Sequence, residues 1–165
     1  NDVDHSYSLA MLGWFLAQYF PDLNRDEVIR IALVHDLVEV HAGDTYLYGD
    51  DELLATKKQR EADALKQLEK EWPDFPDMLE NIRAYEAKDS PEARFVYALD
   101  KIMPILLIYL GGGYTWQSKK ISLAMLHAKK EATTALSPEI KTYYDELYML
   151  LQNNPQLFQA PSQQR

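Results

Sequence analysis

The sequence predicts an all-α protein, a compact single-domain bundle of about six or seven helices. Apolar residues recur at steps of three and four along most of the 165 residues, which is the spacing of one helical face. Capping residues precede these runs, and prolines or glycines end them. No stretch alternates apolar and polar residues as a half-buried strand would. We therefore expect one domain over residues 1–152 and a loosely ordered tail over 153–165, which is rich in Gln and Pro.

The first two predicted helices differ in how much of their surface is apolar. The first is expected to end at Pro21 and to bury one face, formed by His5, Leu9, Leu12, Leu16 and Phe20. The second begins at Asn24, a good cap that acidic residues follow in the first turn. Apolar residues lie on nearly every side of it as far as Val38, which predicts a buried central helix. Gly43 is its expected C-cap, and residues 42–50 are expected to form an irregular loop.

Five further helices are expected, because each has its own start or stop signal. They are expected over about residues 51–72, around 78–85, and over about 91–110, 117–135 and 138–152. Pro73 and Pro76 separate the first two of these, and Ser90 before Pro91 starts the third. Three glycines at 111–113 end that third helix.

Composition excludes several classes of function. The chain has 26 acidic and 17 basic residues, a formal net charge of −9, which argues against binding to a polynucleotide. It has no cysteine, so disulfides, thiolate metal sites and cysteine nucleophiles are excluded. No apolar run is long enough to cross a bilayer, and the N-terminal residues lack the pattern of a signal peptide. We therefore expect a cytoplasmic protein that does not bind membranes.

The second predicted helix ends in a segment that combines apolar and charged residues, HDLVEVHAGD over residues 35–44. His35 and Glu39 are four residues apart, so on one helix they would point the same way. Burying these carboxylates without a partner is costly, and no Lys or Arg lies within residues 31–46. A first-row divalent cation would compensate, because it accepts both imidazole and carboxylate ligands. The alternative is an exposed helix end whose charges are solvated.

Two further residues are candidate ligands. His5 lies on the apolar face of the first helix, where a lone histidine is more often a satisfied core residue. Asp100 is an acid within an apolar helix, and a salt bridge with Lys101 or another residue is the alternative there.

The ordered set of His5, then His35 and Asp36, then Asp100 resembles the H…HD…D signature of the HD-domain metal-dependent phosphohydrolases. Glu39, followed by Gly43 and Asp44, resembles more narrowly the 5′-deoxynucleotidase branch, which removes phosphate from nucleoside monophosphates. Similar segments of that branch continue at Tyr85-Glu86-Ala87, Pro91-Glu92-Ala93 and Leu99-Asp100-Lys101. The resemblance covers residues 1–117 approximately.

This resemblance implies an all-helical enzyme with one divalent metal ion per chain, which could be Mn, Co, Fe, Ni, Zn or Mg. The implied metal ligands are His5, His35, Asp36 and Asp100. Glu39 would position or deprotonate the attacking water, and Asp44 would hold the sugar or the nucleophile with Thr45 beside it.

Several other polar residues are weaker candidates. Lys101, beside Asp100, is a candidate phosphate contact, whereas a solvated helix face is the favoured interpretation of the basic residues of the 51–72 helix. Those residues are Lys57, Lys58 and Arg60. His41 could belong to the site or be a simple loop residue, and His127 is interpreted as structural.

The preferred function is therefore a metal-dependent phosphohydrolase that acts on nucleoside or deoxynucleoside 5′-monophosphates, with a small nucleotide as its partner. One alternative is another metal enzyme on the same scaffold, a cyclic-nucleotide phosphodiesterase or an oxygenase. Those branches add histidines, and between Asp36 and Asp100 this chain has only His41. The other alternative is a non-catalytic helical module that binds a nucleotide. The apolar run 102–110 further suggests a homodimer.

Overall fold

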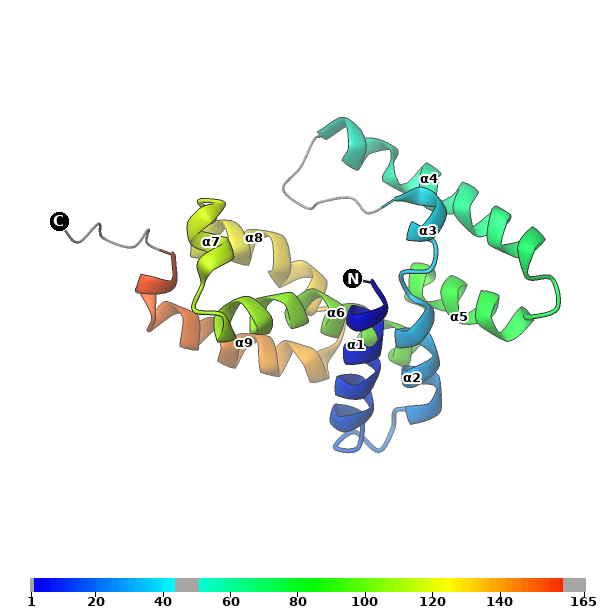
Figure 1. Cartoon of the computed structure of the whole chain (residues 1–165). Helices are drawn as coiled ribbons and strands as arrows, with labels where there is room; N and C mark the ends of the chain where they lie inside the picture. Colours follow the sequence, from blue (N-terminus) through cyan, green and yellow to red (C-terminus); the bar gives the residue numbers. More distant parts are fainter. Residues whose placement is uncertain (1, 44–50, 159–165) are drawn as a thin grey trace. The chain divides into compact units, whose positions relative to one another are not determined.

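The computed structural model describes residues 2–43 and 51–158, and for 51–54 it describes the backbone only. The all-α prediction is confirmed, since every regular element in these residues is helical (Figure 1). The elements are α1 (Asp2–Ala17), α2 (Arg25–Val34), α3 (Glu39–Ala42), α4 (Asp51–Glu71), α5 (Pro76–Ala87), α6 (Pro91–Leu110), α7 (Tyr114–Ser118), α8 (Leu123–Thr134), α9 (Pro138–Gln152) and the 3-10 helix η1 (Pro155–Phe158). This is slightly more than six or seven helices, because two predicted helices are each divided.

The chain forms two compact units, and their boundary falls inside α6. The first unit ends at Ala93 and the second unit begins at Arg94. Each unit is described separately below.

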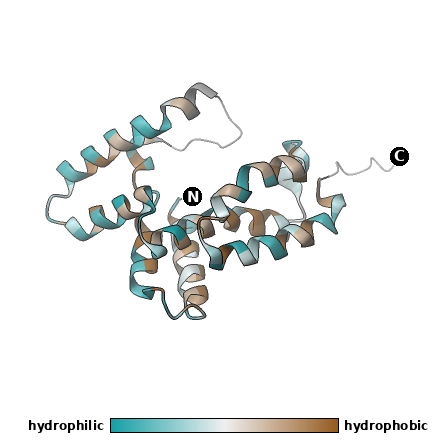
Figure 2. Cartoon of the chain, turned by 180° about the vertical axis from the view of Figure 1, so that it is seen from behind, coloured by the Kyte–Doolittle hydropathy of each residue, from teal (hydrophilic) through white to brown (hydrophobic). Residues whose placement is uncertain are grey.

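The first unit has two packed regions. In one, α1 packs on α2, and α2 packs on α5. His5 lies one turn before the buried Leu9 on α1, while Phe20 lies beyond the end of this helix at Ala17. In the other, α4 contacts α3 and α5. Its core consists of Val38, Ala64, Leu68, Met78, Leu79 and Ile82. Hydrophilic residues prevail along α4 in Figure 2, so this helix buries only a narrow apolar stripe.

The predicted central helix is shorter than expected. The side chain of Asn24 accepts hydrogen bonds from the backbone N–H groups of Asp26 and Glu27, as predicted for a cap. The helix ends at Val34, however, and a tight turn over 35–38 separates α2 from α3. The turn allows both His35 and Val38 to be buried, at 1% and 2% exposure.

The prediction that this helix is buried on nearly every side is also wrong. Leu33 is 46% exposed, and Val40 beyond the turn is 71% exposed. The apolar residues of 28–40 are therefore divided between the core and the surface, which composition alone did not reveal.

The second unit contains most of α6, followed by α7, α8, α9 and η1. The predicted helix over 117–135 is divided, because Lys120 takes a left-handed conformation at φ 54° and Ser122 caps a new helix. After α9 the chain returns to α7, where the rings of Trp116 and Phe158 stack with centroids 4.8 Å apart. Gly113, at φ 78°, lies so close to the backbone of Leu157 that no side chain would fit there.

Within the described part of the chain, no helix combines the length and the apolar character that crossing a bilayer requires. Residues 159–165 of the predicted tail lie outside the described residues, and the homodimer stays a prediction. In the apolar run on which that prediction rests, Leu107 and Leu110 are 59% and 78% exposed, whereas Ile102, Met103 and Ile105 are buried.

Candidate metal centre

The first unit brings three of the four predicted ligands together. His5 comes from α1, and His35 and Asp36 come from the turn that follows α2. The Nε2 atom of His35 lies 3.0 Å from Oδ2 of Asp36, and the Nε2 atom of His5 lies 3.7 Å from the same oxygen. Two imidazole nitrogens thus converge on one carboxylate oxygen. Because α1 and α2 pack together, residues 30 positions apart in the sequence meet here.

His35 is held in a defined orientation. Its Nδ1 lies 2.8 Å from the carbonyl oxygen of Ala32, one turn back on α2. The ring of Tyr85 on α5 meets the His35 ring edge-on, with centroids 5.1 Å apart and an interplanar angle of 69°. A carbonyl oxygen only accepts, so Nδ1 carries the hydrogen and Nε2 presents its lone pair. A histidine whose second nitrogen donates to a backbone carbonyl is the usual arrangement for a metal ligand.

This donor set fits a divalent metal ion. The lone pair on Nε2 of His35 faces a carboxylate oxygen at 3.0 Å, and two such lone pairs repel unless a proton or cation lies between them. Ligand atoms held about 2.1 Å from one ion stand about 3.0–3.4 Å apart. The two nitrogen–oxygen separations, 3.0 and 3.7 Å, lie close to that range. Imidazole and carboxylate together suit Mn, Fe, Co, Ni or Zn.

The three side chains of this cluster differ in their exposure to solvent. The side chain of His35 is fully buried, whereas those of His5 and Asp36 are 25% and 23% exposed. The partial exposure of these two ligands leaves one side of the cluster open to solvent. A catalytic metal site requires such an open position, because water and substrate must reach the ion.

The fourth predicted ligand, Asp100, belongs to the second unit. It is buried, and Nζ of Lys101 donates to its Oδ2 over 2.6 Å, the salt bridge considered from the sequence. The ammonium of Lys101 also lies 4.9 Å from the centre of the Tyr97 ring. Lys101, the predicted phosphate contact, is therefore oriented by its own helix α6.

Lys130 on α8 adds a second cation to this part of the second unit. Burial and, to a lesser extent, the nearby charge of Lys101 lower the pKa of Lys130, and with the opposing effect of Asp100 the result is about 8. The charge of Asp100 therefore acts on both Lys101 and Lys130.

Glu39, predicted to position or deprotonate the attacking water, is the first residue of α3 and is half-buried. His35 and Glu39 do not lie on one continuous helix, because the N–H of Glu39 bonds to the carbonyl of Asp36, three residues back, within a turn. That the two side chains point the same way stays a prediction. Asp44 and Thr45, the predicted sugar or nucleophile contacts, lie outside the described residues.

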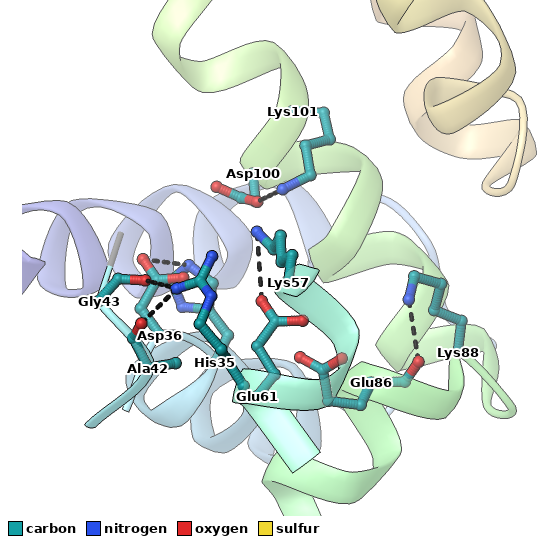
Figure 3. Close-up of polar contacts among 11 residues, drawn as sticks. His35, Asp36, Ala42, Gly43, Lys57, Glu61, Glu86, Lys88, Asp100 and Lys101 are labelled. Atoms are coloured by element: carbon teal, nitrogen blue, oxygen red, sulfur yellow. Dashed lines mark hydrogen bonds and ion pairs between the residues drawn. The ribbon is translucent and has the colours of Figure 1, made fainter. Parts of the chain in front are cut away.

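The weaker candidates have local partners. Nζ of Lys57 pairs with Glu61 at 3.2 Å, and Lys58 is exposed (Figure 3). Nε2 of His41 lies 2.9 Å from Oε2 of Glu71. The side chain of Gln67, and then His41, donates to Glu71 and lowers the pKa of this carboxyl.

His127, interpreted as structural from the sequence, packs within the second unit. Its Nδ1 lies 2.9 Å from the hydroxyl of Tyr144, and its ring stacks on Tyr148 with centroids 4.2 Å apart. Glu131, one turn along α8, lies 3.3 Å from its other ring nitrogen.

Three contributors to these clusters were not found from the sequence. Tyr85 appeared as a periodic apolar position and within a segment of the family resemblance, and Lys130 was not singled out. Arg60 was grouped with a solvated face, yet its guanidinium donates to the carbonyl oxygens of Ala42 and Gly43. No local pattern signals these contacts, because each joins elements that are distant along the chain.

Several curated proteins that are similar to this chain share one name. The chain is 36% identical over 105 residues to a Bos taurus protein named 5′-deoxynucleotidase HDDC2, and 34% identical over 105 residues to the Homo sapiens protein of that name. Each match covers 62% of this chain and 50% of the relative. The chain thus spans about half the length of the curated relatives it matches.

A solved structure and a family model agree with this similarity. The crystal structure described as a predicted metal-dependent phosphohydrolase from Magnetospirillum magnetotacticum matches with a TM-score of 0.76 at 28% sequence identity. The match covers 98% of this chain and 81% of that one. The family model of the HD domain matches residues 1–141. With the ligand cluster of His5, His35 and Asp36 in place, the chain belongs to the HD-domain family.

Proposed function

We propose that this HD-domain protein is a metal-dependent phosphohydrolase that releases phosphate from nucleoside or deoxynucleoside 5′-monophosphates. One observation carries the proposal: the Nε2 atoms of His5 and His35 converge on Oδ2 of Asp36. The names of the similar proteins, a 5′-deoxynucleotidase and a metal-dependent phosphohydrolase, support the choice of reaction and substrate.

In this proposal His5, His35 and Asp36 hold one divalent ion, and Asp100 is the fourth ligand that the family resemblance implies. A bound divalent ion supplies positive charge to the transferring phosphate group and lowers the pKa of a coordinated water. The hydrogen bond from Nδ1 of His35 to Ala32 keeps the opposite nitrogen available as a ligand.

The remaining roles belong to carboxylates and one ammonium group. Glu39 takes the proton of the attacking water as a general base, so that water attacks phosphorus as a hydroxide equivalent. Asp44, with Thr45, binds the sugar. Lys101 offers its ammonium to a phosphate oxygen, and its contact with the Tyr97 ring keeps the group in place.

The test is phosphate release from a panel of ribo- and deoxynucleoside 5′-monophosphates. Metal-stripped protein is assayed after separate addition of Mn, Co, Zn or Mg, together with the variants Glu39→Gln and Glu146→Gln. Glu146 is an exposed carboxylate on α9, so its variant is a matched control for the loss of one charge. We expect metal-dependent release, and a fall in kcat of about 10²–10⁴-fold in Glu39→Gln only.

Metal binding to Glu39→Gln should equal that of the wild-type protein, because Glu39 is not a proposed ligand. The absence of release from every monophosphate with every metal would contradict the substrate class. Full activity in Glu39→Gln would contradict the assignment of the base. Hydrolysis of cyclic nucleotides to monophosphates, with no release of phosphate from the monophosphates, would favour the phosphodiesterase alternative.

A further inference from the structure

The helix that carries the proposed base is too short to be stable alone. α3 contains only the four residues Glu39–Ala42 and follows a turn. A single helical turn in isolation is strongly unfavourable, because ordering the first residues yields almost no hydrogen bonds. Its position must therefore come from tertiary contacts, and the helix it packs on is α4.

One side chain of α4 binds the C-terminal end of α3. Nη1 of Arg60 donates to the carbonyl oxygen of Ala42 and, over 3.4 Å, to that of Gly43. Dashed lines mark both contacts at the labelled residues Ala42 and Gly43 in Figure 3. Carbonyls at a helix C-terminus lack partners within the helix and carry partial negative charge. A guanidinium group satisfies both needs, and its planar fork can reach two oxygens at once.

The contact with Arg60 also affects the backbone at Gly43. The N–H of Gly43 bonds to the carbonyl of Glu39 over 2.8 Å, and Gly43 has φ 75°. Arg60 thus holds the residue whose amide closes the single turn that begins at Glu39. The next residue along the chain is Asp44, the proposed sugar contact.

A second link between α3 and α4 is weaker. His41 and Glu71 form a pair 2.9 Å apart, but their side chains are 30% and 38% exposed. Exposed ion pairs contribute little, since solvent screens them and two side chains must be ordered. Arg60 is half-buried, and its partners are backbone atoms whose positions define the helix itself.

We propose that Arg60 is a positioning residue, which fixes α3 and so sets the placement of Glu39 and of the chain entering Asp44. Its effect on catalysis rests on the proposed function, whereas its effect on the backbone of α3 does not. These two hydrogen bonds of Arg60 end on backbone oxygens, those of Ala42 and Gly43.

The experiment compares Arg60→Ala and Arg60→Lys with Arg83→Ala. Arg83 on α5 also reaches α4, through a 2.6 Å contact with Glu69, but its side chain is exposed and this partner is a carboxylate of α4, not a backbone oxygen of α3. It is therefore a matched control for loss of an interhelical arginine. Amide hydrogen exchange of residues 40–43 is followed by mass spectrometry of the full chain. We expect exchange there to become at least about 10-fold faster in Arg60→Ala and to stay unchanged in Arg83→Ala.

The kinetic readout separates positioning from binding. We expect kcat for the best monophosphate to fall about 10–100-fold in Arg60→Ala, with KM changed less than about threefold, because misplacing a reacting group acts on the chemical step. Metal affinity should stay within about twofold of wild type, since the ligands lie outside α3. Arg60→Lys should restore part of kcat, because an ammonium reaches one carbonyl, and added guanidinium ion should raise the kcat of Arg60→Ala.

Each contrary result has a distinct meaning. Unchanged exchange at residues 40–43 in Arg60→Ala overturns the proposal. So does faster exchange spread evenly over the whole first unit, because that pattern assigns Arg60 to general stability. A wild-type protein without phosphohydrolase activity contradicts the proposed function alone, since the exchange measurement still decides whether Arg60 holds α3.

Discussion

Each of the two units places a carboxylate beside nitrogen atoms, but the kind of nitrogen differs between the units. In the first unit, Oδ2 of Asp36 faces Nε2 of both His5 and His35, and the group is partly open to solvent. In the second unit, Asp100 is buried and accepts from the ammonium of Lys101 over 2.6 Å. An imidazole can present a lone pair at neutral pH, whereas a lysine ammonium cannot.

This difference indicates which positively charged partner each carboxylate requires. The first-unit cluster gathers lone pairs, and a divalent cation between them would remove their mutual repulsion. The second-unit carboxylate already has the ammonium of Lys101 beside it. We therefore expect metal affinity to depend most on the first unit and metal-free stability to depend more on the second.

The largest expected effect is on metal affinity. His35→Gln keeps much of the side-chain volume but removes the buried ligand nitrogen that faces Asp36. We expect the affinity for Mn or Zn to fall at least about 100-fold, or about 2.8 kcal/mol. Isothermal titration of the metal-stripped protein measures this loss, with His127→Gln as the matched control. Affinity within threefold of wild type would show that the first-unit cluster does not hold the ion.

The next effect concerns stability without metal. Asp100→Asn leaves Lys101 and the half-buried Lys130 without their balancing charge, and we expect it to lower the free energy of unfolding by about 2–4 kcal/mol. Asp36→Asn changes a partly exposed group and should cost less than about 1 kcal/mol. Urea denaturation in the presence of a chelator compares the two variants. A larger loss in Asp36→Asn would reverse the proposed difference between the units.

The smallest expected effect is pH-dependent. The folded-state pKa of Lys130 is about 8, below its ordinary value of 10.5, so folding disfavours its charged form. The resulting destabilisation is complete below pH 8 and disappears as pH rises to 10.5, because the unfolded chain then also loses the proton. Lys130→Met should raise the unfolding free energy by about 1–3 kcal/mol at pH 7.

Urea denaturation of metal-free Lys130→Met and wild-type protein at pH 7 and at pH 10.5 tests this effect. The difference between the two proteins should shrink over that interval. A stabilisation that is equal at both pH values would point to packing of the methionine side chain in place of the lost charge.

Much of the fold could be predicted because its signals are local. Asn24 caps α2 as expected, and Pro76, Pro91 and Pro138 each begin a helix. The division between α2 and α3 could not be predicted, because residues 35–38 contain no proline or glycine. This turn is stabilised because it buries His35 and Val38 among different neighbours. The apolar periodicity of a single segment does not predict which neighbours those are.

The candidate site was predictable in its residue types but not in its arrangement. His5, His35 and Asp36 were selected by their order along the chain, and packing of α1 on α2 brings them together. His35 and Glu39 were expected on one continuous helix, but a turn separates them. Assignments for Glu39, Asp44, Thr45, Lys101 and Asp100 stay predictions.

The sequence by itself determined the helical class, most helix ends and the donor chemistry of the metal cluster. These properties depend on residue type and on neighbours within about four positions. Only the tertiary structure decided that Tyr85 packs edge-on against His35, that the half-buried Lys130 is affected by the charge of Asp100, and that Arg60 binds the C-terminal end of α3. Each of those contacts depends on the relative placement of helices, since burial and hydrogen bonding between distant segments have no signature in a local pattern.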